Sequence, residues 1–240
     1  MRLYLDVPYQ EKEEAKALGA KWDARVRKWY TDVFPPEYVR FAKWLLRDRD
    51  QALIATEYIY LLDSQRPCFR CGRPTNVVGL GVGEFFLLSD DGTGPRYEFF
   101  EDRIDPGEEI HLAWTEDEDD IPPKLLDYIK RNYPVRTGFS KTLGRRCFAN
   151  HCQHCGAMQG NWFLFQEPDS PLSSDAFGQE LEERMQRLRI KQIPIEDNLL
   201  LRWDVSLCSN DHAYMGAPRE ELILAEDPEE VYVTYGELYS

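Results

Sequence analysis

Two copies of the motif C-x-x-C-G lie far apart in the 240-residue sequence, at residues 68–72 and 152–156. Two residues between a pair of cysteines allow both thiolates to face one metal ion. A glycine directly after the second cysteine permits the left-handed turn that points backbone N–H groups at the sulfur atoms. Two such knuckles complete a tetrahedral shell of sulfur. The predicted ligands of one zinc ion are Cys68, Cys71, Cys152 and Cys155.

The role predicted for this ion is structural, because four thiolates fill the coordination sphere of zinc and leave no position for a reactive water molecule. The alternatives are two unrelated pairs of reduced cysteines, or one redox dithiol. Neither motif lies at the helix start of a βαβ unit, where a thioredoxin-type pair belongs. The motifs are separated by roughly 80 residues, which is tolerable because the cost of loop closure grows only logarithmically with length. The pattern therefore indicates a split zinc ribbon around a segment that folds by itself.

Other cysteines and histidines are less specific candidates for a metal site. Cys147 lies close to the second motif and could replace one of its ligands. Cys208 and His212 have the i, i+4 spacing that suits a metal ion on a helix, although the residues between them favour a turn. His151 and His154 flank the second motif, and we expect them to form hydrogen bonds or face solvent.

Basic and aromatic side chains alternate in a second group of candidate residues near the N-terminus. In many proteins that bind single-stranded nucleic acid, aromatic rings stack on the bases while cations hold the phosphates. The candidates for this role are Arg25, Arg27, Lys28 and Trp29. The competing interpretation is that Trp22 and Trp29 form the small core of a unit with few other large apolar groups, and that the basic residues face solvent.

The elements that must position these residues fall into two predicted domains, residues 1–50 and residues 51–240. The first shows a short alternating strand, a helix that ends before Gly19, a hairpin, and a second helix that begins at the Pro35-Pro36 pair. It is predicted to be a small αβ unit.

The second domain is predicted to be rich in strands, with glycines and a strong turn signal between them. Its predicted elements are strands at 77–80, 84–88, 97–100 and 230–239, a turn at 90–95, and helices that begin at Pro122 and span 179–188. Gly81 and Gly83 are expected to join the first two strands. Together the two domains predict an α+β fold, in which the split zinc ribbon clasps a β-rich body.

Composition and charge limit the classes of function. The chain is 42% hydrophobic and 13% aromatic, as is typical of globular proteins. Its net charge of -14 argues against a general DNA-coating role, because phosphate binding needs a positive field. Residues 1–50, however, carry 11 basic and 9 acidic residues. We therefore expect any contact with nucleic acid to use residues 1–50 only.

The sequence predicts neither a signal peptide nor a membrane span, because no window reaches about 18 apolar residues in a row. A cytoplasmic location and no membrane partner are therefore the expectation. In a reducing compartment, six cysteines indicate metal ligands before disulfides.

The N-terminal part also carries a longer pattern. It reads V-P-Y at residues 7–9, E-A-K-A-L-G-A at 14–20, K-W-D at 21–23 and K-W-Y at 28–30. This pattern resembles a small domain of unknown function found in plasmid-type primases and other mobile-element proteins. The resemblance covers about a fifth of the chain and implies an association with DNA handling, not a known reaction. The remainder of the chain, with S-K-T at residues 140–142, A-N-H-C-Q-H-C-G at 149–156 and Q-G-N-W-F at 159–163, resembles uncharacterised bacterial zinc-ribbon proteins.

No catalytic motif is recognised, since the sequence has no Walker A loop, nucleophile elbow or dinucleotide fingerprint. We interpret the chain as a non-catalytic, zinc-stabilised binding or adaptor protein with a protein partner, in a mobile-element or DNA-handling context. The alternative is an enzyme that acts on nucleic acid and whose catalytic residues form no known motif. An open metal position, or two close carboxylates in a cleft, would favour that alternative.

Overall fold

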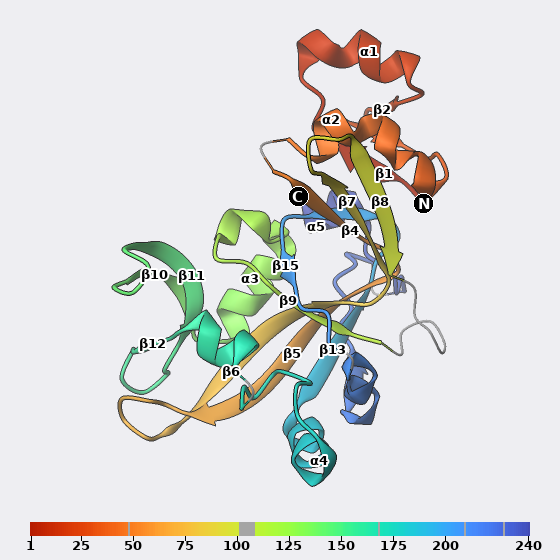
Figure 1. Ribbon diagram of the computed structural model, residues 1–240. Coiled ribbons are helices and arrows are strands. Elements are labelled where there is room, and N and C mark those ends of the chain that lie inside the picture. Colours follow the sequence, from red (N-terminus) through yellow and green to blue (C-terminus); the bar gives the residue numbers. More distant parts are fainter. Residues whose placement is uncertain (48, 101–108, 168, 209, 228) are drawn as a thin grey trace.

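The computed structural model describes residues 1–240 except 48, 101–108, 168, 209 and 228. It has an α+β fold that is rich in β-structure, as the sequence predicts (Figure 1). The strands form four sheets, and the helical segments lie around them. Within the described part of the chain, no helix is both long and apolar enough to cross a membrane.

The N-terminal unit is a three-stranded antiparallel sheet with helical turns around it, in the order β1-β3-β2. Its elements are β1 (Leu3–Leu5), η1 (Tyr9–Glu11), α1 (Lys12–Ala17), β2 (Lys21–Asp23), β3 (Lys28–Thr31), η2 (Pro35–Phe41) and α2 (Ala42–Leu45). Gly19 follows α1 with a φ of 100°, a left-handed conformation that glycine adopts without strain. The predicted order of strand, helix, hairpin and helix is therefore confirmed, although most of the second helix is a 3-10 helix.

The hydrophobic core of the N-terminal unit continues past residue 50. Phe41 and Trp44 are buried in one cluster with Ile54 and Phe86, which belong to strands of the body. An isolated β-bridge also joins Leu3 to Asn198. The N-terminal unit therefore packs on the body through apolar contact, not only through the connecting chain.

The rest of the chain supplies three sheets and six helical segments among the described residues. The strands are β4 (Gln51–Ala55), β5 (Tyr58–Pro67), β6 (Pro74–Val82), β7 (Phe85–Asp90), β8 (Pro95–Phe100), β9 (His111–Trp114), β10 (Val135–Ser140), β11 (Arg145–His151), β12 (Met158–Gln159), β13 (Arg189–Pro194), β14 (Leu199–Leu201), β15 (Asp204–Val205) and β16 (Arg219–Glu221). The helical segments are η3 (Glu118–Asp120), α3 (Pro123–Asn132), the π-helical turn η4 (Trp162–Gln166), α4 (Gly178–Arg187), η5 (Asp211–Gly216) and α5 (Tyr235–Leu238).

The centre of the body is a six-stranded sheet in the order β15-β9-β6-β5-β13-β16, and it is covered on both faces. Successive side chains of a strand point to opposite faces. Ile59 and Leu61 of β5 accordingly join the cluster that contains α3 and α5, while Tyr60 and Leu62 join the cluster that contains η4, α4 and η5. The four-stranded sheet β14-β4-β7-β8 connects this body to the N-terminal unit.

Two predictions about local structure are wrong. The tail has no strand between residues 230 and 239, apart from one isolated bridge at Val233. It forms α5 instead, because Thr234 and Glu237 make a reciprocal capping box at its start. Gly81 lies inside β6 and not in a turn, since the strand continues to Val82. The predicted turn at 90–95 does join two paired strands, β7 and β8.

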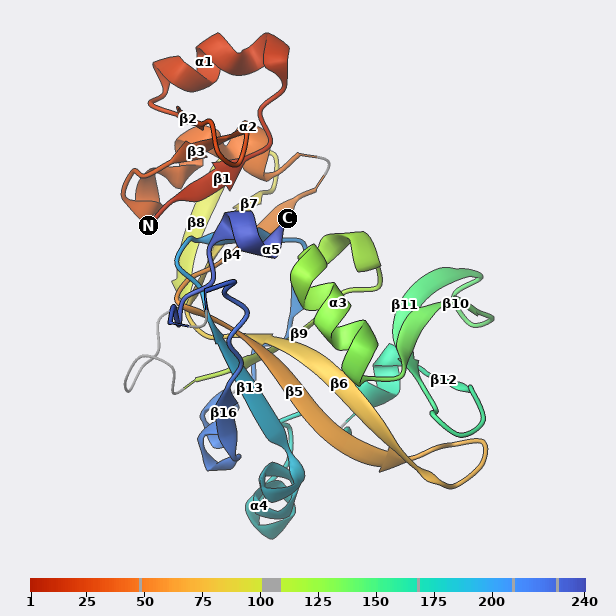
Figure 2. The same ribbon diagram turned by 180° about the vertical axis from the view of Figure 1, so that it is seen from behind.

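The three-stranded sheet β10-β11-β12 projects from the body, and we call residues 135–159 the arm (Figure 1). The turn between β5 and β6, residues 68–73, reaches out beside it, and we call this turn the hairpin end. Figure 2 shows both together from behind, with the N-terminal unit well away from them. The two cysteine motifs lie in the hairpin end and in the turn between β11 and β12.

Candidate metal centre and nucleic-acid interface

The four cysteines of the two motifs converge on one point, with all their sulfur atoms within 4.8 Å of one another. The Sγ atoms of Cys68 and Cys155 lie 3.7 Å apart, and so do those of Cys71 and Cys152. A tetrahedral site with metal–sulfur bonds of about 2.3 Å has edges of about 3.8 Å. A disulfide would need about 2.05 Å. The spacing therefore fits a metal site.

The two motifs have the same backbone structure. Gly72 and Gly156 both have a φ of 68°, which is the left-handed conformation expected from the sequence. The N–H of Gly72 donates to the carbonyl of Cys68 at 2.8 Å, and the N–H of Gly156 donates to the carbonyl of Cys152 at 2.9 Å. The two knuckles are thus copies of one turn, and each offers two sulfurs to the shared point.

Backbone N–H groups stabilise the thiolate form of one cysteine in each knuckle. The N–H of Arg70 lies 3.4 Å from Cys68 Sγ, and the N–H of His154 lies 3.4 Å from Cys152 Sγ. Burial opposes ionisation of Cys68, but the N–H groups of Cys71 and Arg70 outweigh it and lower the pKa of this thiol to about 6. The pKa of Cys152 is lowered in the same way, against the effect of burial.

One thiol of the group resists ionisation more than the thiols of Cys68 and Cys152. The N–H of Ala157 favours the thiolate of Cys155, yet burial and the neighbouring thiols of Cys71 and Cys152 raise the pKa of Cys155 to about 11. A bound metal ion removes this conflict, because it deprotonates its thiol ligands outright. The four thiols together form a donor set that suits a soft metal cation.

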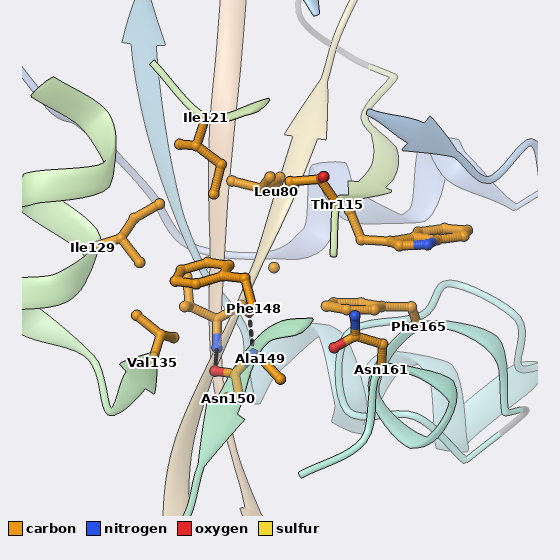
Figure 3. Close-up of a pocket in the computed structure, with 13 residues that line it drawn as sticks. Leu80, Thr115, Ile121, Ile129, Val135, Phe148, Ala149, Asn150, Asn161 and Phe165 are labelled. Atoms are coloured by element: carbon orange, nitrogen blue, oxygen red, sulfur yellow. Dashed lines mark hydrogen bonds between the residues drawn. The ribbon is translucent and has the colours of Figure 1, made fainter. Parts of the chain in front are cut away.

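Hydrogen bonds fix the arm to the strand that follows the hairpin end. The Asn150 side chain accepts a hydrogen bond from the N–H of Val78 and donates one to its carbonyl, both at 2.9 Å (Figure 3). The side chain thereby makes the two hydrogen bonds that the backbone of a neighbouring strand would make with Val78. Nε2 of His154 lies 2.9 Å from the carbonyl of Pro74. His154 therefore joins the second knuckle to the start of β6.

A small cavity of ≈ 30 Å³ lies where the arm meets the body. Ile129, Val135 and Phe148 form one wall, and Phe165 and Asn161 form another (Figure 3). This volume holds a water molecule or two and no larger ligand. The root of the arm is therefore a packed joint.

The other candidate metal ligands lie outside the four-cysteine group. Among the described residues, no second group of three or more His, Cys, Asp or Glu side chains has the spacing of a metal site. Cys147 is buried in β11 opposite Gly138. The N–H of Cys208 donates to Asp211, and His212 lies in η5.

One buried polar cluster could not be found from the sequence. Asp211 Oδ2 lies 2.8 Å from His111 Nδ1, and Ser174 Oγ donates to Asp211 Oδ1 at 2.9 Å. In a catalytic triad the histidine lies between the hydroxyl and the carboxylate. Here the carboxylate lies between the other two, so the arrangement satisfies a buried Asp211 and does not activate Ser174. The three residues come from distant segments, and no motif spacing connects them.

A groove of ≈ 630 Å³ crosses the N-terminal unit, and we call it the N-terminal groove. The predicted residues Arg27, Lys28 and Trp29 line it, and Arg25 does not. Trp29 is only 9% exposed and belongs to the core, as the competing interpretation holds. Lys28 is paired with Asp6 at 2.6 Å.

Trp22 lines the N-terminal groove and is 51% exposed, so the competing interpretation that places it in the core is wrong for this residue. Sequence reasoning missed three further residues of the groove. Tyr9 is 76% exposed and adds an aromatic ring. Arg47 and Arg202 add two guanidinium groups. Arg202 is far from the other groove residues in the sequence, so only the fold brings it there.

Comparison with known proteins supports the N-terminal resemblance. Residues 2–45 match a domain of unknown function, DUF5710. Two proteins of Escherichia coli named DNA primase TraC are similar to the chain, at 51% identity over 47 residues and 46% identity over 56 residues.

These similarities cover 18% and 23% of this chain, and only 3% and 5% of the two primases. No solved structure matches the chain. The comparisons therefore link the N-terminal unit to proteins that handle DNA.

Proposed function

We propose that the chain is a non-catalytic, zinc-stabilised binding protein that serves a DNA-handling system of mobile elements. The observation that carries the proposal is the set of four cysteine sulfurs at the spacing of a tetrahedron. Soft thiolate ligands in tetrahedral geometry select zinc over magnesium, calcium or manganese. Cys68, Cys71, Cys152 and Cys155 would hold the ion and leave no open position for a water nucleophile.

The proposed role of the zinc ion is to join two distant parts of the chain. We call the two cysteine motifs, residues 68–72 and 152–156, together the clasp. The hairpin end carries two of the ligands, and the turn between β11 and β12 carries the other two. The buried apolar cluster at this place contains only Cys68, Cys152 and Ala157. Because so little apolar surface is buried there, the free energy of metal binding would supply the stability of the clasp.

The binding activity that we propose for the N-terminal groove is recognition of single-stranded DNA. Trp22 and Tyr9 offer ring faces for stacking, and Arg27, Arg47 and Arg202 offer positive charge for phosphates. The similarity of this unit to part of a DNA primase supports the same proposal. Trp29 would stabilise the groove from below. A protein partner from the same DNA-handling system would bind elsewhere on the surface.

The zinc proposal is tested by elemental analysis of protein purified without added metal. We expect one zinc per chain, and none in the Cys71→Ser variant. The matched control is Cys208→Ser, which removes a cysteine outside the cluster and should keep the metal. Zinc retained in Cys71→Ser and lost in Cys208→Ser would refute the assignment.

The DNA proposal is tested by fluorescence anisotropy with a labelled single-stranded oligonucleotide. The full chain is needed, because the core of the N-terminal unit extends into the body. The double variant Arg27→Gln, Arg47→Gln should bind more weakly and reduce the slope of log affinity against log salt by about 1.4. The control Arg40→Gln, Arg96→Gln removes the same charge from two surface ion pairs outside the groove. Equal binding by the two variants would rule out the groove as the site.

A further inference from the structure

The two segments that contain the cysteine motifs are positively charged, although the chain as a whole is acidic. Residues 64–83 and 128–166 together contain nine Lys and Arg residues and no Asp or Glu, in a chain that carries 43 acidic residues and a net charge of -14. The two segments are far apart in the sequence, and each alone is a modest basic stretch. The rest of the chain therefore has a charge of -23, and a strong positive excess is gathered in these two segments.

The fold brings the two basic segments together. The hairpin end belongs to the first, and the arm belongs to the second, and Figures 1 and 2 show them projecting side by side from the body. Arg70, Arg73 and Lys141 are exposed there. Among the described residues, these three side chains form no salt bridge, whereas Arg145 is paired with Glu116. The region thus presents unpaired cations to solvent.

Exposed aromatic side chains lie among these cations. Phe69, Phe139 and Trp162 are 66%, 61% and 59% exposed. Phe139 lies opposite Arg146 in the β10–β11 pair. The Arg66 guanidinium lies over the Phe163 ring, 5.8 Å from its centroid. Large exposed apolar groups that gather in one region mark an interaction surface.

The surface is hollowed beside η4 by a groove of ≈ 250 Å³, which we call the arm groove. The arm groove is lined by four large apolar side chains, those of Trp114, Leu143, Trp162 and Phe163. Asn161 lines the groove too, and within the described part of the chain its buried Nδ2 atom has no hydrogen-bond acceptor. The arm groove therefore presents aromatic ring faces, whereas the Nδ2 atom of Asn161 is buried and offers no donor to it.

We infer that the arm and the hairpin end form a second surface for single-stranded nucleic acid, separate from the N-terminal groove. Arg70, Arg73 and Lys141 would contact phosphates, and the arm groove would take an unstacked base between its aromatic side chains. Phosphates attract unpaired cations, and every base has a ring face for stacking. An acidic peptide would satisfy the cations and leave the exposed rings unused. The inference goes beyond the proposed function, since it concerns different residues.

The experiment is anisotropy with a labelled single-stranded oligonucleotide over a series of salt concentrations, on the full chain loaded with metal. The triple variant Arg70→Gln, Arg73→Gln, Lys141→Gln should bind at least tenfold more weakly and reduce the salt slope by about 2. Trp162→Ala keeps the charge and should bind at least fivefold more weakly through lost stacking. The control Arg40→Gln, Arg96→Gln, Arg187→Gln changes the charge equally on residues that are ion-paired elsewhere.

The outcomes separate this surface from the N-terminal groove. Weaker binding by the triple variant than by its control supports the inference, whatever the groove variant Arg27→Gln, Arg47→Gln does. Equal binding by the triple variant and its control overturns it, and the groove proposal can still stand. Polyglutamate that competes as well as unlabelled oligonucleotide would also overturn it, because the surface would then recognise charge alone. Metal content, measured on every variant, ensures that the clasp is intact.

Discussion

The N-terminal unit and the arm are both small, and they are held together by different means. The N-terminal unit shares a cluster of buried side chains with the body, which includes Phe41, Trp44, Ile54 and Phe86. The buried cluster at the cysteine site has three members, Cys68, Cys152 and Ala157. Burial of apolar surface therefore stabilises the N-terminal unit, whereas little apolar surface is buried at the cysteine site.

The two regions also differ in how far their basic residues are paired with acidic ones. Several basic residues of the N-terminal unit are paired with acidic ones, as in the pairs Lys21–Asp32 and Lys43–Glu14. The basic segments at the clasp have no acidic residues of their own. A net charge for a whole chain, or for one half of it, therefore hides where a positive surface lies. The expectation that nucleic acid contacts use residues 1–50 only rests on such a sum.

Removal of the metal should give the largest difference between the two regions. A chelator should expose the arm and the hairpin end to hydrogen exchange, because apparent binding free energies of structural zinc sites are about 10–16 kcal/mol in zinc-finger peptides. The amides of β1 and β3 should stay protected, since their core contains no metal ligand. Hydrogen exchange with mass spectrometry measures both regions in one sample. Equal loss of protection in both would show that the clasp supports the whole fold.

The reverse perturbation is Phe41→Ala. Phe41 is fully buried, and we expect the free energy of unfolding to fall by about 3–5 kcal/mol. Because its cluster includes residues of β4 and β7, the N-terminal unit and the four-stranded sheet should lose stability together. Urea denaturation followed by hydrogen exchange checks this, and the metal content should not change. Unfolding of residues 1–50 alone would instead support the predicted domain boundary at residue 50.

Sequence reasoning succeeded where one short segment determines the structure. The two C-x-x-C-G motifs predict the turns with left-handed Gly72 and Gly156, because each turn is made within one short stretch of chain. The helix at Pro122 and the turn at 90–95 have equally local signals.

It failed where the partner of a residue comes from a distant segment. Arg202 joins the N-terminal groove and Asn150 pairs with Val78 only through the fold. The sequence also does not predict which side chains are exposed. Trp22 and Trp29 are similar in sequence context, yet Trp22 is 51% exposed and Trp29 is 9% exposed. The positive surface was missed because residues 84–127 separate its two halves in the sequence, and only the fold brings them together.

The contribution of the Asn150–Val78 hydrogen bonds to the stability of the arm can be tested with Asn150→Asp. A carboxylate still accepts from the N–H of Val78, but it faces the Val78 carbonyl without a donor, which should cost about 1–3 kcal/mol or somewhat more for a charged group. The control is Asn76→Asp on the same strand as Val78, where the side chain only accepts from Gln65 near the surface. Thermal unfolding should show a large loss for the first variant and little for the second. A lower pH should restore part of the loss, because the introduced carboxyl group can donate again once it is protonated.

The smallest expected effects concern the glycines of the clasp, and Gly72→Ala separates backbone strain from metal binding. Gly72 has a φ of 68°, and a Cβ placed there meets nothing within 4 Å, so the cost is conformational and about 1–2 kcal/mol. Gly144 in the β10–β11 turn has a φ of 67° and equally open surroundings, which makes Gly144→Ala a matched control. Both variants should lose similar stability when the metal is saturating. Only Gly72→Ala should also weaken metal affinity, because its turn positions the sulfurs of Cys68 and Cys71. Equal metal affinity in the two variants would mean that the cluster tolerates a distorted knuckle. Gly72 would then contribute to the stability of the fold and not to metal affinity.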